Sequence, residues 1–96
     1  GEVGYARGAL GYDALVAGDY QRAEIQLQTG HGVSVDDPAR LLNLSMVYLR
    51  TGRIETARTI LEYVRDSRHS EDLELGDGRE VNSREVARMM LASINR

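Results

Sequence analysis

The chain has 96 residues, a net charge of −3 at neutral pH and no cysteine. This length suits one domain, and 42% apolar with 28% charged residues is typical of a globular chain. The slight acidity argues against nucleic acid as a partner, the missing cysteines exclude disulfides and thiolate zinc sites, and no apolar run is long enough to predict membrane insertion.

The first two predicted helices lie on either side of Gly18. Small and apolar residues recur at four-residue spacing from Ala6 to Ala17, which predicts a helix over about 5–17 that ends at the glycine. Asp19 is a good N-cap for a second helix, which ends by Gly30. The buried stripe of this second helix is predicted to hold Tyr20, Ala23 and either Ile25 or Leu27.

A second pair of helices follows the loop that contains the only proline. Asp37 suits an N-cap and Pro38 suits the first helical position, so we predict a helix from about Pro38 to Thr51 that Gly52 ends. A fourth helix is predicted over about 54–67. Its buried residues would be Ile54, Ala57, Ile60, Leu61 and Val64.

The two helix pairs repeat with a period of 34 residues. When the sequence is aligned with itself at an offset of 34 residues, Gly18 falls on Gly52 and several other positions also carry identical residues. Such a period is typical of stacked helical pairs. The matching positions are Leu10 with Leu44, Leu15 with Leu49, Ala23 with Ala57 and Leu27 with Leu61.

The repeat stops near residue 70. Alternating residues on both sides of a Gly-Asp-Gly turn predict a short hairpin or an ordered loop over 70–81. Asn82 or Ser83 then caps a last helix over about 82–95. Its apolar face, which would cover the fourth helix, holds Val86, Met89 or Met90, Leu91 and Ile94.

At these positions the sequence resembles the tetratricopeptide repeat (TPR) family. The resemblance rests on a small residue in the first helix, a small or aromatic one three further on, a turn glycine and an alanine in the second helix: Gly11 and Ser45, Ala14 and Tyr48, Gly18 and Gly52, Ala23 and Ala57. It implies an all-α fold, an α-solenoid of two antiparallel helix hairpins (about 4–37 and 38–69) with a C-terminal capping helix, in a single domain over 1–96. The aromatic that usually opens each repeat is replaced by Arg7 and Leu41.

The TPR resemblance implies a non-catalytic protein–protein interaction module that binds a peptide or protein segment in the concave groove lined by the first helix of each repeat. One branch of the family grips a C-terminal carboxylate there, but only Asn43 fits that pattern. An alternative is that Leu42, Met46 and Tyr12 are simply core residues. The expected partner-binding residues are Tyr5, Tyr12, Asn43, Met46 and Arg50, from a concave surface that also includes Gly8, Ala9, Val16, Ala39 and Leu42.

Catalysis is not expected from this sequence. His31 and His69 lie near acidic residues, but both fall in loops without a nucleophile at a useful spacing, so we expect structural or solvent-exposed roles, no metal site and no cofactor. Two alternative functions remain open. The chain could self-associate as a homodimer through an open solenoid end or the last helix, or it could be an accessory domain of a larger enzyme.

Overall fold

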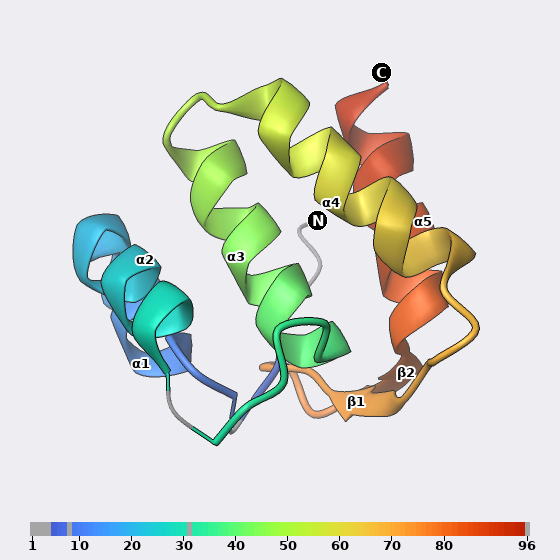
Figure 1. Ribbon diagram of the computed structural model, residues 1–96, viewed down its shortest axis with the longest axis horizontal. Helices are drawn as coiled ribbons and strands as arrows, with labels where there is room; N and C mark the ends of the chain where they lie inside the picture. Colours follow the sequence, from blue (N-terminus) through green and yellow to red (C-terminus); the bar gives the residue numbers. More distant parts are fainter. Residues whose placement is uncertain (1–4, 8, 31, 96) are drawn as a thin grey trace.

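The computed structural model describes residues 5–7, 9–30 and 32–95, which form five helices and one two-stranded antiparallel sheet (Figure 1). The central helix α3 packs against α2, α4 and α5, and α5 also covers α4. A mostly helical chain was predicted, and this is confirmed. In chain order the elements are α1 (Tyr12–Val16), α2 (Tyr20–Thr29), α3 (Pro38–Arg50), α4 (Ile54–Asp66), β1 (Asp72–Glu74), β2 (Glu80–Asn82) and α5 (Ser83–Ile94).

The later helices begin where local capping residues predict. The Asp19 carboxylate accepts from the Arg22 N–H at 3.2 Å, and the Asp37 carboxylate accepts from the Arg40 N–H at 3.0 Å. Asn82, and not Ser83, caps α5. Helices α2 to α5 therefore lie within one or two residues of the predicted ranges, because their ends are encoded by neighbours in sequence.

The turns inside the two helix pairs have the same geometry. Gly18 and Gly52 both adopt left-handed backbone, with φ of 76° and 80°. Each turn closes with the long backbone hydrogen bond typical of a helix that ends in left-handed glycine. In the first turn the N–H of Asp19 donates to the carbonyl of Ala14, and in the second the N–H of Arg53 donates to the carbonyl of Tyr48, both at 2.8 Å. The corresponding residues of the two turns lie 34 positions apart in the sequence.

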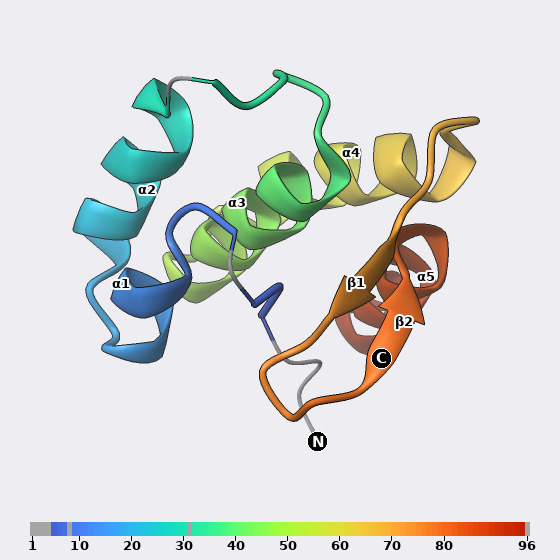
Figure 2. The ribbon, with the colours of Figure 1, turned by 90° about the horizontal axis from the view of Figure 1, so that it is seen from below.

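The prediction for the first helix is wrong over its first half. A helix over about 5–17 was expected, but α1 begins at Tyr12, and Ala6 instead forms an antiparallel β-bridge with Leu75 (Figure 2). Two glycines, at positions 8 and 11, weaken helix formation in this stretch. Gly11 has a φ of 76°, so the backbone cannot run into α1 as a continuous helix. The first repeat thus contributes an extended segment and a short helix in place of one full helix.

Alanine at Gly11 should destabilise the fold more than alanine at Gly18. Both positions have positive φ, so each substitution pays about 1 kcal/mol of backbone strain. Only at Gly11 does an added Cβ collide, lying 2.9 Å from Cγ of Leu27, whereas nothing lies within 4 Å at Gly18. We expect Gly11→Ala to lose a further ~1–3 kcal/mol in urea unfolding. Equal losses for both variants would contradict this contact.

A polar cluster ties α2 to the turn before α4. The Arg53 guanidinium donates to both carboxylate oxygens of Glu24, and its Cζ lies 4.6 Å from the centre of the Tyr48 ring. The Gln28 amide donates to Glu24 and to the Tyr48 hydroxyl, both at 3.3 Å. The hydrogen bonds from Arg53 lower the pKa of Glu24 below its ordinary value of 4.5.

The Glu24–Arg53 pair should stabilise the fold in a pH-dependent way. A carboxylate with a lowered pKa contributes its full stability above its unfolded pKa and loses it as pH falls through the folded value. The difference in urea midpoint between wild type and Arg53→Gln should therefore be constant at neutral pH and shrink below about pH 4.5. Arg68→Gln is the control, because Arg68 is exposed, and its difference from wild type should not change with pH. If the difference in urea midpoint between wild type and Arg53→Gln stays the same at acid pH, the Glu24–Arg53 pair does not stabilise the fold as described.

The segment over 70–81 forms a hairpin. Leu73 lies opposite Val81, and Ser83 closes the open end, since its N–H donates to the Glu71 carbonyl at 2.7 Å and its hydroxyl accepts from the Glu71 N–H at 3.0 Å. Because strand residues alternate between faces, Leu73 and Leu75 both turn into the core. Within the described part of the chain, no helix is both long and apolar enough to cross a bilayer.

Candidate functional site

Residues 5–7 lie along the outer edge of the hairpin. The Arg7 N–H donates to the Glu74 carbonyl at 2.8 Å, next to the bridge between Ala6 and Leu75. The Arg7 guanidinium also donates to the Glu74 carboxylate at 2.9 Å. Hydrogen bonds to Glu74 and then to Tyr12 raise the pKa of Arg7 above its ordinary value. The segment therefore pairs with the hairpin through both main chain and side chain.

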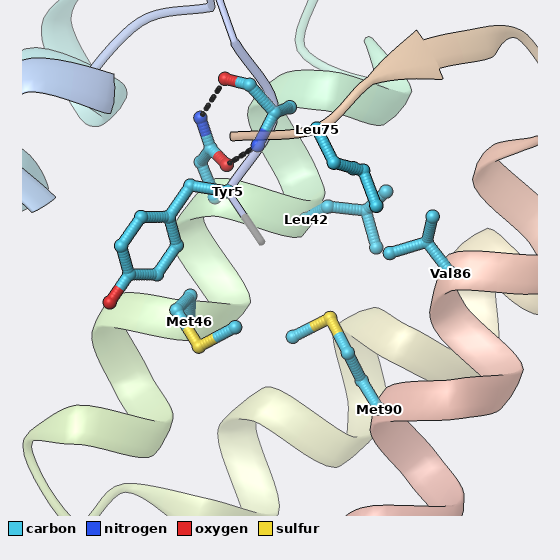
Figure 3. Close-up of a pocket in the computed structure, with 8 residues that line it drawn as sticks. Tyr5, Leu42, Met46, Leu75, Val86 and Met90 are labelled. Carbon is cyan, nitrogen blue, oxygen red and sulfur yellow. Dashed lines mark hydrogen bonds between the residues drawn. The ribbon is translucent and has the colours of Figure 1, made fainter. Parts of the chain in front are cut away.

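Asn43 of α3 also holds this segment, through hydrogen bonds to Ala6 that Figure 3 draws as dashed lines. Its Oδ1 accepts from the Ala6 N–H at 3.0 Å, and its Nδ2 donates to the Ala6 carbonyl at 3.3 Å and to the Leu10 carbonyl at 3.2 Å. The residue is only 1% exposed. Its amide thus satisfies main-chain groups that would otherwise be buried without partners.

A small cavity lies beneath the segment. Its lining comes from the N-terminal segment, α3, the hairpin and α5, and Figure 3 shows the Tyr5 ring above Met46, which faces Met90. The volume is about 10 Å³, close to the space one water molecule needs and far below that of a metabolite pocket. We call the surface that holds residues 5–7 the segment groove: Leu42, Asn43 and Met46 of α3, Glu74 and Leu75 of the hairpin, and Val86 and Met90 of α5.

The structure brings three of the five expected partner-binding residues together. Tyr5, Asn43 and Met46 all line the cavity. Tyr12 instead lies against the hairpin turn, where a Cβ added at Gly76 would approach its hydroxyl to 3.1 Å. Arg50 is exposed in the last turn of α3 and is not among the cavity-lining residues. Of the wider concave surface, Gly8 lies outside the described residues.

Leu75, Val86 and Met90 were not predicted as site residues. The alternation around the Gly-Asp-Gly turn signals that Leu75 shares a face with Leu73, but not which element this face meets. Val86 and Met90 were predicted on the apolar face of the last helix, against α4. They also line the cavity together with residues of α3 and the N-terminal segment, because α5 packs against α3 as well as α4.

His69 does not line this site. The His69 ring lies 3.4 Å from the Glu71 carboxylate on the surface, and His31 lies outside the described residues. Over residues 5–7, 9–30 and 32–95, no group of three or more His, Cys, Asp or Glu side chains is arranged to hold a metal ion. Among the residues that line the cavity, only Tyr5 carries a titratable side chain.

Comparison with known proteins gives no match, whether against protein-family models, curated proteins or solved structures.

Proposed function

We propose that this chain is a non-catalytic protein-interaction module, built from two stacked TPR-like hairpins, that binds an extended polypeptide segment in the segment groove. The observation that carries the proposal is the two-way hydrogen bonding between the Asn43 side chain and the main chain of Ala6. A side-chain amide that both donates to and accepts from the main chain of one residue makes the same pair of hydrogen bonds that a neighbouring strand would make. It therefore suits recognition of an extended backbone.

The hairpin supplies a second contact of the same kind. The outward carbonyl of Glu74 accepts from a segment N–H, which is how an extended peptide adds to a sheet edge. Main-chain bonds of this type give affinity, while pockets for alternate side chains give specificity. The buried Ala6 side chain occupies such a position.

The stacked-hairpin part of the proposal is supported by the repeated turns. Identical backbone bonds 34 residues apart, and full burial of Ala23, Leu27, Ala57 and Leu61 at matching positions, are what two copies of one structural unit require. The resemblance to tetratricopeptide repeats agrees with binding on the face that α3 presents. The apolar lining and small volume of the groove fit a polypeptide backbone better than a reacting metabolite.

The test uses a variant of the 96-residue chain in which residues 5–7 should leave the groove. Ala6→Glu places a carboxylate at a position that is 4% exposed, so the segment should leave the groove while the helices remain. A fluorescein-labelled peptide of residues 3–10 should then bind in anisotropy titrations, and it should bind wild type at least about tenfold more weakly, since the tethered segment competes.

The control for this titration is the double variant Ala6→Glu, Asn43→Ala. It should lose peptide binding, because the amide that holds the backbone is gone. Circular dichroism must show the helical content of wild type in both variants. If the Ala6→Glu chain is helical and still binds no peptide, the proposed function is wrong.

A further inference from the structure

We infer that Asp77 and Gly78, in the turn between β1 and β2, form a site of spontaneous isoaspartate formation, and that Arg79 restrains this reaction in the folded chain (Figure 2). The inference is independent of the proposed function, because it needs neither the segment groove nor a partner. It rests on the sequence of the turn, on the hydrogen bonds that hold the turn and on its exposure to water.

The reaction uses only groups of the chain and water. The main-chain nitrogen of Gly78 attacks the side-chain carboxyl carbon of Asp77. A C–N bond forms, and the proton of the nitrogen leaves with the carboxyl hydroxyl as water. Water then opens the resulting succinimide ring at either carbonyl, which restores aspartate or leaves the main chain running through the side-chain carboxyl of Asp77. No atom is oxidised or reduced, so the reaction needs no cofactor.

The glycine after Asp77 makes this position reactive. A side chain on the following residue hinders attack by the nitrogen of that residue, and glycine has none. Asp77 is the only aspartate of the sequence that is followed by glycine, and no asparagine is followed by glycine. Gly78 also faces open space, since nothing lies within 4 Å of a Cβ added there. At Asp72, by contrast, the next residue is Leu73, which is buried and belongs to β1.

Arg79 restrains the Asp77 carboxylate. Its main-chain N–H donates to Oδ1 at 3.0 Å and its Nε donates to Oδ2 at 2.6 Å, so both carboxylate oxygens are held. These hydrogen bonds, the main-chain one first, lower the pKa of Asp77 below its ordinary value of 3.8. The neutral acid loses its hydroxyl as water more readily than the anion loses an oxygen. A lowered pKa therefore leaves less of the reactive form at any pH above it.

The attacking nitrogen is held as well. The Gly78 N–H donates to the Leu75 carbonyl at 2.9 Å, and the Leu75 N–H donates to the Arg79 carbonyl at 2.8 Å. The first of these bonds must break before the nitrogen of Gly78 can bond to carbon, because its proton leaves. The folded turn thus slows the reaction at both reacting groups, and an unfolded chain lacks both restraints.

Isoaspartate at position 77 should loosen the hairpin. The rearrangement adds a methylene group to the main chain before Gly78, so the Gly78 N–H moves away from the Leu75 carbonyl that it reaches now. Leu75 is 1% exposed and also forms the bridge to Ala6. A changed turn therefore disturbs the part of the hairpin that packs into the core, and isomerised chains should unfold at lower urea concentration than intact ones.

The experiment ages the 96-residue chain at mildly acidic pH and follows position 77 by peptide mapping. Trypsin cuts after Arg68 and Arg79, so one peptide carries Asp72 and Asp77 together. Asp72 is then the internal control within that peptide. The succinimide appears as a peptide lighter by one water, and isoaspartate is measured by methyl transfer from S-adenosylmethionine with an isoaspartyl methyltransferase.

Matched variants separate the site from its restraint. Arg79→Gln should raise the rate of isoaspartate formation about threefold, a factor that fits an ion pair whose side chains are 50% and 48% exposed. Arg68→Gln removes another exposed arginine and should leave the rate unchanged. Asp77→Glu should abolish the reaction, because the longer side chain closes a ring far more slowly. In concentrated urea, wild type and Arg79→Gln should react equally fast, and both faster than folded wild type.

Each outcome decides one part of the inference. If urea-unfolded wild type forms no isoaspartate at Asp77, or forms more at Asp66 than at Asp77, the site is wrong. If folded Arg79→Gln, with the helical content of wild type by circular dichroism, ages no faster than folded wild type, the role of Arg79 is wrong. The comparison of wild type with and without urea tests the site even if Arg79→Gln does not fold. None of these outcomes depends on peptide binding, so the proposed function stands or falls separately.

Discussion

Replacing Asn43 with alanine should lower the free energy of unfolding by about 3 kcal/mol, the largest loss we expect from a single polar side chain. The substitution leaves the buried N–H and carbonyl of Ala6, and the partly buried carbonyl of Leu10, without their partner. Buried groups that lose a hydrogen bond cost more than the bond itself contributes. Urea unfolding followed by circular dichroism measures the loss.

Asn95→Ala is the matched control for this measurement. Asn95 is exposed and its side chain accepts from Arg58 at the surface, so the change should cost about 0.5 kcal/mol or less. Similar losses at both asparagines would show that the amide of Asn43 does not hold the segment. Asn43→Asp adds a further check, because it keeps an acceptor for the Ala6 N–H, loses both donated bonds and buries a charge.

Replacing Leu61 with alanine should cost about 2–5 kcal/mol. The side chain is fully buried on α4, a helix that packs against both α3 and α5, so its removal leaves a cavity in the helical core. Leu61→Met, which keeps the volume, should cost less than about 1.5 kcal/mol. The urea midpoints of the two variants give the comparison.

Ile25→Ala serves as the control for Leu61. Ile25 is 56% exposed on α2, although the sequence left open whether it or Leu27 is buried, and the structure buries Leu27. Its truncation should change stability by no more than about 0.5 kcal/mol. If Ile25→Ala lowers the free energy of unfolding as much as Leu61→Ala does, the assignment of Ile25 as exposed and Leu61 as buried is wrong.

The predictable parts of this fold are those that neighbouring residues determine. Asp19, Asp37 and Asn82 cap helices a few residues away, and Gly18 and Gly52 turn the chain where they stand. The 34-residue offset also identified the buried leucines at positions 27 and 61. These features need only local hydrogen bonding and the period of a helix.

The conformation of residues 5–7 was not predictable from local pattern. Ala6 and Leu10 are spaced as on a helix, but the partner that holds Ala6 extended is Asn43, 37 residues further along the chain. Such a contact leaves no periodic signal. Asn43 itself was expected in a groove that binds a partner, and the structure shows its side chain bound to the chain's own backbone.

The bridge between Ala6 and Leu75 also determines the order in which the molecule assembles. It joins residues that lie 69 positions apart in the sequence, and non-local contacts of this kind form slowly. The helical layers can nucleate without it. We therefore expect residues 5–7 to dock last during folding and to detach from the hairpin first under mild denaturant, before the helices unfold.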